Sequence, residues 1–153
     1  MSGNSTSRLD AAMVAFVALA KGALSIPVYD GPPAISTTPQ DCLIVGIEQW
    51  TPGQMITAVD LTQDWSALGH LNRDETGTIH AVMVAWGGDT SMTALRARVV
   101  ANLALVESAA RANPDMGGTV LWVEIKPVRL SWIRAPQGNE AQLYFTADYK
   151  ARI

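Results

Sequence analysis

The stretch that most constrains the fold is residues 89–118, because it has the pattern of one long amphipathic helix with a signal at each end. Residues 89–91 (Asp-Thr-Ser) are types that cap a helix N-terminus by accepting hydrogen bonds from its first N–H groups. Pro114 disfavours the helical conformation in the residue before it, and the glycines at 117 and 118 supply a turn. The apolar face is marked by residues spaced three and four apart: Leu95, Val99, Leu103, Val106 and Ala110.

Patterns typical of strands lie on both sides of this helix. In residues 58–67, apolar or large side chains (Val59, Leu61, Gln63, Trp65, Ala67) alternate with polar or small ones, which predicts a strand with one buried and one wet face. Residues 78–86 are apolar on both faces, so we expect them to lie centrally in a sheet. The polar residues 69–77 between them are predicted to form the turn of a long hairpin spanning 58–86.

A second hairpin is predicted at the C-terminal end. Residues 119–134 form one arm and residues 141–153, which alternate strictly, form the other, with a turn at 137–139. Pro127 marks a bulge or an edge position, because proline cannot donate a hydrogen bond to a neighbouring strand. Shorter apolar runs at 26–29 and 41–47 indicate two further short strands.

Together these elements predict an α+β fold: a mostly antiparallel sheet of two long hairpins, with the long central helix across one face and an N-terminal helix. The N-terminal helix is indicated by one apolar face. A chain of 153 residues fits a single domain covering residues 1–153. The face of the N-terminal helix comprises Leu9, Met13, Phe16, Ala20 and Leu24.

The composition is unusually poor in charge. Charged residues make up 16% of the chain and hydrophobic residues 48%, where soluble domains have about 25% charged residues. Such a surface is typical of a protein partly covered by other subunits; the alternative is a monomer with a bland Ala, Thr and Gly surface. The net charge of −3 argues against a protein that grips nucleic acid. The apolar run 11–20 after Arg8 resembles a signal peptide, but Asp10 borders it and it is too short to span a bilayer.

The sequence contains no recognisable catalytic or metal-binding pattern, so we expect no enzymatic activity, no cofactor and no metal. Cys42 lies in an apolar run and is expected to pack as a small hydrophobic residue. His70 and His80 have no cysteine or carboxylate at metal-ligand spacing. The glycines at 87 and 88 open a helix as a phosphate-binding loop does, but no lysine follows and Asp89 would repel phosphate.

The order of motifs resembles the tail terminator family of long-tailed bacteriophages, also called tail completion or minor tail proteins in actinobacterial phages. An N-terminal helix leads to VYDGPP (28–33) and then to DCLIVGI (41–47). The hairpin ending in IHAVMVAWGGD (79–89), the helix ending in PDMGG (114–118) and the strands VLWVEIKPVRLSWI (120–133) and QLYFTADYKARI (142–153) complete the match. The resemblance covers nearly the whole chain, and it rests on the order and spacing of the motifs.

The resemblance implies a structural protein of the virion. Members of the family form a hexameric ring that caps the head-proximal end of the tail tube, ends its polymerisation and joins it to the head connector. The implied partners are further copies of the chain, the major tail tube protein and the connector. Genomic DNA would pass through the lumen without specific binding, which agrees with the acidic balance. The implied location is the tail, after assembly in the host cytoplasm, with no membrane contact.

Two surfaces are candidate interaction sites. Arg96, Arg98 and Glu107 fall outside the apolar face of the central helix and are candidate subunit contacts, so Arg98→Ala is expected to leave monomer stability unchanged. The turn of the first hairpin is unusually charged, which suggests a tip that docks on an axial neighbour; an ordinary solvated hairpin end is the alternative. The tip comprises His70, Asn72, Arg73, Asp74 and Glu75.

Two other functions remain open at this point. Another head–tail joining protein of the same neck would share the resemblance but act on the head side. A small intracellular enzyme or ligand-binding α+β domain would require a concave pocket with convergent polar groups.

Overall fold

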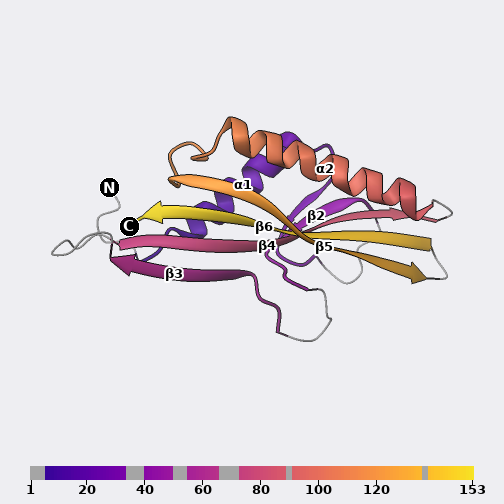
Figure 1. The fold of residues 1–153 in the computed structure, drawn as a ribbon, viewed down its shortest axis with the longest axis horizontal. Coiled ribbons are helices and arrows are strands. Elements are labelled where there is room, and N and C mark those ends of the chain that lie inside the picture. Colours follow the sequence, from indigo (N-terminus) through magenta and orange to yellow (C-terminus); the bar gives the residue numbers. More distant parts are fainter. Residues whose placement is uncertain (1–5, 34–39, 50–54, 66–72, 89–90, 136–137) are drawn as a thin grey trace.

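The computed structural model describes residues 6–33, 40–49, 55–65, 73–88, 91–135 and 138–153, and these form two helices and a six-stranded sheet (Figure 1). The predicted α+β class is confirmed. The elements follow in the order α1 (Leu9–Ala23), β1 (Val28–Asp30), β2 (Cys42–Val45), β3 (Val59–Trp65), β4 (Arg73–Gly87), α2 (Met92–Ala112), β5 (Trp122–Ala135) and β6 (Gly138–Arg152).

The sheet is organised around β4. One edge of β4 pairs with β6 along almost its whole length, and β5 pairs with the far side of β6. The other edge is shared, because β3 pairs with the first half of β4 and β2 with the second half. The strand order is therefore β1-β2-β4-β6-β5, with β3 beside β4. Only the short pair of β1 and β2 is parallel among the described strands; the other pairs are antiparallel, as predicted.

Helix α2 lies across one face of the sheet, as the sequence predicts (Figure 1). Of the three predicted cap residues, Ser91 is the N-cap, and its hydroxyl accepts from the N–H of Ala94 at 3.2 Å. Asp89 and Thr90 lie outside the described residues. The helix ends at Ala112, two residues before Pro114. All five predicted core residues are buried: Leu95, Val99, Leu103, Val106 and Ala110.

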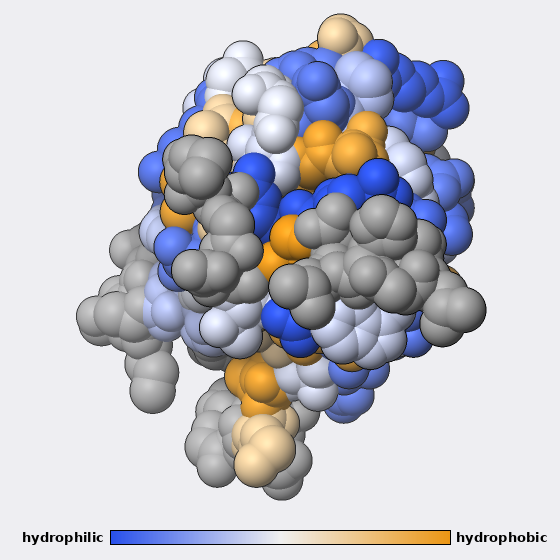
Figure 2. Space-filling view, turned by 90° about the vertical axis from the view of Figure 1, so that its left-hand side faces the viewer, coloured by the Kyte–Doolittle hydropathy of each residue, from blue (hydrophilic) through white to orange (hydrophobic). Residues whose placement is uncertain are grey.

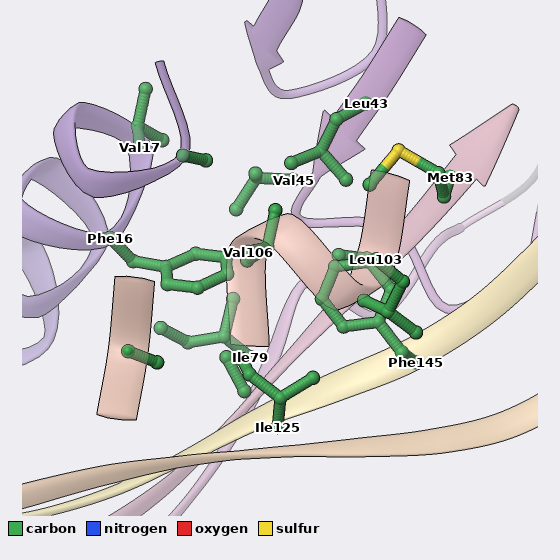
Figure 3. Packing of buried hydrophobic residues seen from close by; sticks show 14 of the residues in the cluster. Phe16, Val17, Leu43, Val45, Ile79, Met83, Leu103, Val106, Ile125 and Phe145 are labelled. Carbon is green, nitrogen blue, oxygen red and sulfur yellow. The ribbon is translucent and has the colours of Figure 1, made fainter. Parts of the chain in front are cut away.

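The main core lies between this face of the sheet and the two helices (Figure 3). Phe16 of α1 meets Phe145 of β6 edge to face, with 6.5 Å between ring centroids. The buried face of α1 is rotated from the predicted one. Phe16, Ala20 and Leu24 are buried as expected. Leu9 and Met13 are only half buried, and Ala12 and Val17 take the inner positions.

Neither of the two described helices covers the opposite face of the sheet. A smaller apolar cluster lies there, formed by β2, β4 and β6 side chains with Ile47 from the loop after β2. Val82 and Val84 of β4 point to this cluster, whereas Ala81 and Met83 point to the main core. The prediction that this strand is apolar on both faces is confirmed.

The first hairpin differs from its prediction in two ways. Strand β4 begins at Arg73, so residues 73–77, predicted as turn, are strand paired with β3 and β6. The predicted buried face of β3 is also wrong in part, because Leu61 and Trp65 are 42% and 63% exposed. Strand β3 lies at the margin of the sheet, away from α2, where nothing described covers these side chains (Figure 1).

The second hairpin forms as predicted, but β6 begins at Gly138, so Gly138 and Asn139, predicted as turn, are strand; Gln137 lies outside the described residues. Strands β5 and β6 pair from Trp122–Lys150 to Ala135–Gly138. The register shifts between Pro127 and Arg129, so Pro127 lies at a bulge in an edge strand. Pro127 was predicted to lie at a bulge or in an edge strand, and it lies at both.

Candidate functional site

The most densely connected polar group among the described residues is Glu75, whose side chain is fully buried. Its carboxylate accepts four hydrogen bonds from three segments of the chain. One oxygen, Oε2, accepts from Ser7 Oγ at 2.6 Å and from Gln63 Nε2 at 2.7 Å. The other, Oε1, accepts from Tyr149 Oη at 2.7 Å and from the backbone N–H of Arg8 at 3.1 Å. Glu75 thereby joins the segment before α1 to β3, β4 and β6.

Gly77 makes this arrangement possible. It lies directly opposite Tyr149 in the register of β4 and β6. A Cβ on residue 77 would lie 2.1 Å from Cε1 of the Tyr149 ring, which no real contact allows. The ring therefore crosses β4 over the missing side chain and brings its hydroxyl to Glu75. The sequence pattern predicts Gly77 at the end of a turn. Its role in packing depends on Tyr149, which is distant in the sequence.

The hydrogen bonds decide the ionisation state of this site. Burial alone raises the pKa of Glu75, but the donors on Ser7, Tyr149, Gln63 and Arg8 outweigh burial and leave the pKa below its usual range. Burial and the neighbouring carboxylate raise the pKa of Tyr149. At neutral pH the pair is thus a carboxylate and a neutral phenol that donates to it.

The burial of Glu75 removes it from the predicted docking tip, and the docking role of the other tip residues stays a prediction. Glu75 is buried and fully engaged by its own chain. Arg73 donates to Gln63 Oε1 at 2.9 Å, and Asp74 accepts from Arg152 Nε at 2.9 Å. These side chains brace the β3–β4–β6 end of the sheet. His70 and Asn72 lie outside the described residues.

Arg98, a predicted subunit contact, has partners within its own chain, although its side chain is 42% exposed. Its guanidinium forms a two-pronged ion pair with Asp41, in which Nε donates to Oδ2 at 3.0 Å. It also donates to the backbone oxygen of Trp86 at 3.0 Å, while Asp41 accepts from the N–H of Trp86 at 2.9 Å. Arg98 therefore fastens the first half of α2 to the ends of β2 and β4.

The other two predicted contacts remain open. Arg96 is exposed on α2. Glu107 is half buried and pairs with Arg111 one turn further on, at 2.7 Å. An exposed helical pair of this kind contributes only about 0.3–0.5 kcal/mol, so Glu107 could exchange its partner at small cost.

The candidate reactive side chains are held in unreactive surroundings. Burial, with the nearby charges of Glu140 and Asp41, raises the pKa of Cys42 to about 11, so the thiol stays protonated at neutral pH and is a poor nucleophile. His80 binds Asp60 through Nε2 at 2.8 Å across β3 and β4. No group of three or more potential metal ligands occurs among the described residues.

A small pocket lies on the helix-free face, beside the bulge of β5. Its volume is about 70 Å³, and its walls include Ile47, His80, Arg129 and Tyr144. Pockets that enclose small-molecule ligands usually measure roughly 300–1,000 Å³. Arg129 stacks over the Tyr144 ring at 4.3 Å and donates to the backbone oxygen of Glu48 at 3.0 Å, so the polar groups here already have partners. The pocket therefore gives little support to the ligand-binding alternative.

The margins of the sheet expose apolar side chains that were not predicted from the sequence. Strand β5 is an edge strand and exposes Trp122, Val128, Trp132 and Ile133, each by 39–56%. Strand β3 exposes Leu61 and Trp65. Figure 2 views the end of the molecule that carries both termini, where hydrophilic surface surrounds small hydrophobic patches. Exposed large side chains on unpaired strands are a common feature of interaction surfaces.

Comparison with known proteins adds no family: no family model matches the chain, and no curated protein matches it. Neither described helix is long and apolar enough to cross a membrane.

Proposed function

We propose that this protein is a structural component of a bacteriophage tail, which assembles into a ring of about six copies on the head-proximal end of the tail tube. The ring ends polymerisation of the tube and joins the tail to the head connector. Further copies of the chain, the tube protein and the connector are its partners, and DNA passes through the lumen. The protein acts in the virion after assembly in the host cytoplasm, and it carries out no chemical reaction.

The observation that carries the proposal is the exposed apolar surface along two margins of the sheet, in a chain with only 16% charged residues. The tryptophans at 122, 132 and 65 are exposed to solvent in the single chain. Copies of the chain that cover both margins of the sheet would bury such side chains. The order of motifs from the N-terminal helix to the last strand supports the tail terminator in particular.

The second line of support is the way the polar side chains are used. Glu75 at one end of the sheet and the half-buried Arg98 of α2 both hold parts of the fold together. Cys42 and His80 are likewise occupied by burial or by a partner. A rigid domain with apolar margins fits a building block better than it fits a catalyst.

The test is reconstitution on tail tubes. Purified protein is mixed with tubes polymerised from the tube protein of the same phage, and the complexes are imaged by electron microscopy. We expect a ring at one end of each tube and no further growth when tube subunits are added. A ring at the head side of the neck instead, located by gold-labelled antibody on complete particles, would favour another head–tail joining protein. Protein that neither binds tubes nor joins any part of the neck would refute the proposal.

A further inference from the structure

Two margins of the sheet have strands without partners on their outer sides among the described residues: β5 beyond β6, and β3 beyond β4. On β5, the bulge at Pro127 divides the strand. The segment before the bulge, residues 121–127, comprises Leu121 and the first six residues of β5, and it is as long as β3, which has seven residues. The outer edges of the two segments could therefore pair along their full length, but only between different copies, because they lie on opposite margins of one sheet.

The directions of the strands fit such a contact. Strand β4 is antiparallel to both β3 and β6, and β5 is antiparallel to β6, so β5 and β3 run in opposite directions. If two copies stand side by side in the same orientation, β5 of the first therefore meets β3 of the second as an antiparallel pair. This is the head-to-tail relation that a closed ring requires.

The side chains select a register. When Asp60 stands opposite Lys126, Trp65 stands opposite Leu121, and Leu61, Trp65 and Leu121 share one face. Trp122 falls on the other face, opposite Asp64. On that face Leu61 and Trp65, exposed by 42% and 63%, would lie beside Leu121, exposed by 50%. On the other face Asp60, which binds His80 and has a side chain 70% exposed, would lie beside Lys126, which binds Asp148 and is 56% exposed. Opposite charges directly across a strand pair stabilise it.

We propose that the ring is closed by pairing between the outer edge of β3 in one copy and residues 121–127 of β5 in the next, with Asp60 opposite Lys126. This contact rests on the proposed ring and names its interface. Pro127 and the bulge end the pairing at one side, since proline offers no N–H beyond that point. The sheet of each copy would continue into the next, and Leu61, Trp65 and Leu121 would become buried.

Disulfide cross-linking tests the register directly. Asp64 and Trp122 stand opposite each other in the proposed pair, and within one copy they lie three strands apart, about 14 Å at ~4.8 Å per strand. A disulfide requires Cα atoms roughly 4.4–6.8 Å apart, so cysteines at these positions can join only different copies. The variants are Asp64→Cys and Trp122→Cys, mixed on tail tubes under mild oxidation. Cys42 is buried and adds no background reaction.

The control pairs Asp64→Cys with Ile133→Cys, which lies on the same strand beyond the bulge and is equally exposed, at 41% against 39% for Trp122. We expect disulfide-linked dimers from the first mixture and at least about tenfold fewer from the control, since each ~1.4 kcal/mol of contact preference is a factor of ten. A second, independent readout is assembly itself. Leu61→Lys should weaken ring formation about tenfold, whereas Leu105→Lys, on the outer side of α2 and 50% exposed, should not.

The outcomes separate the contact from the function. Rings that form on tubes, with equal cross-linking in both mixtures and no effect of Leu61→Lys, would overturn the edge contact and leave the proposed function intact. Lys126 and Pro127 would then serve to keep the edge unpaired. Wild-type protein that never assembles would refute the proposed function, and the contact with it.

Discussion

Replacing Glu75 by glutamine removes a buried charge while keeping the shape of the side chain. The four donors around the carboxylate make this a severe change. Whichever way the new amide is oriented, its NH₂ group replaces one acceptor oxygen. At the Oε2 position it would face the amide N–H of Gln63, and at Oε1 it would face the backbone N–H of Arg8. Neither donor can turn into an acceptor, because Gln63 Oε1 is already held by Arg73.

The expected cost follows from the bonds lost. A hydrogen bond to a charged group contributes about 1.5–3 kcal/mol, and two of them meet at each oxygen of Glu75. The Glu75→Gln variant should therefore lose about 3–6 kcal/mol of unfolding free energy at pH 7. Domains of this size have a total stability of only about 5–15 kcal/mol. We therefore expect the variant to unfold at a lower temperature than the wild-type protein.

The dependence on pH gives the prediction its sign. The hydrogen bonds hold the folded-state pKa of Glu75 below its usual value of 4.5. The ionised carboxylate therefore contributes stability above pH 4.5, and this contribution is lost as the pH falls through the lower, folded-state pKa. The difference between wild type and Glu75→Gln should be largest near neutral pH and should shrink in acid.

Urea unfolding at pH 7 and at pH 4, followed by tryptophan fluorescence, measures both quantities. The matched control is Glu124→Gln, whose side chain is 59% exposed on β5 and which should change stability by no more than about 0.5 kcal/mol. A Glu75→Gln protein as stable as this control, or one whose deficit is the same at both pH values, would refute the account of the network.

Three further substitutions test other parts of the fold by the same unfolding assay. Gly77→Ala should cost about 3–5 kcal/mol, comparable to loss of a buried aromatic ring, and much less in a Tyr149→Ala background that leaves room for the methyl group. Leu103→Ala should cost about 2–5 kcal/mol by opening a cavity beneath α2; a smaller loss would mean that this face is poorly packed. Arg98→Ala should cost about 1–3 kcal/mol because it strands Asp41, in place of the neutral result expected from the sequence; unchanged stability would restore Arg98 as a candidate subunit contact.

The sequence predicted the elements whose signals are local. The central helix, a cap within residues 89–91 and the buried face through Leu103 follow from spacing and capping chemistry alone, whereas the choice of Ser91 among the three comes from the structure. The bulge at Pro127 follows from the missing N–H of proline. The α+β class follows in turn, because a long helix between hairpins has few ways to bury its apolar face.

The errors have a common cause in contacts between distant parts of the chain. Glu75 has the appearance of a turn residue when seen beside its neighbours, and only the fold brings Ser7 and Tyr149 to it, 68 and 74 residues away in sequence. Arg98 seemed free because Asp41, its partner, is 57 residues away. Neither the composition nor the hydrophobic periodicity of a sequence distinguishes a charged side chain that has partners within the fold from one that is exposed to solvent.

The exposure of β3 was missed for a related reason. Alternation indicates that a strand has two unlike faces, but it does not indicate whether anything covers the apolar one. Trp65 and Leu61 lie on such a face at the margin of the sheet. The same alternation that predicts a buried side chain is therefore compatible with a surface awaiting a partner.

The central claim, that this chain builds a ring on a tail tube, is tested most directly by measuring the mass of the protein alone and after mixing with tail tubes. Mass photometry or light scattering of the free protein, with electron microscopy of the capped tubes, provides the measurement. The account predicts about six copies in a closed ring at one tube end, whether the free protein is a monomer or already assembled. A strict monomer that never binds tubes would contradict it.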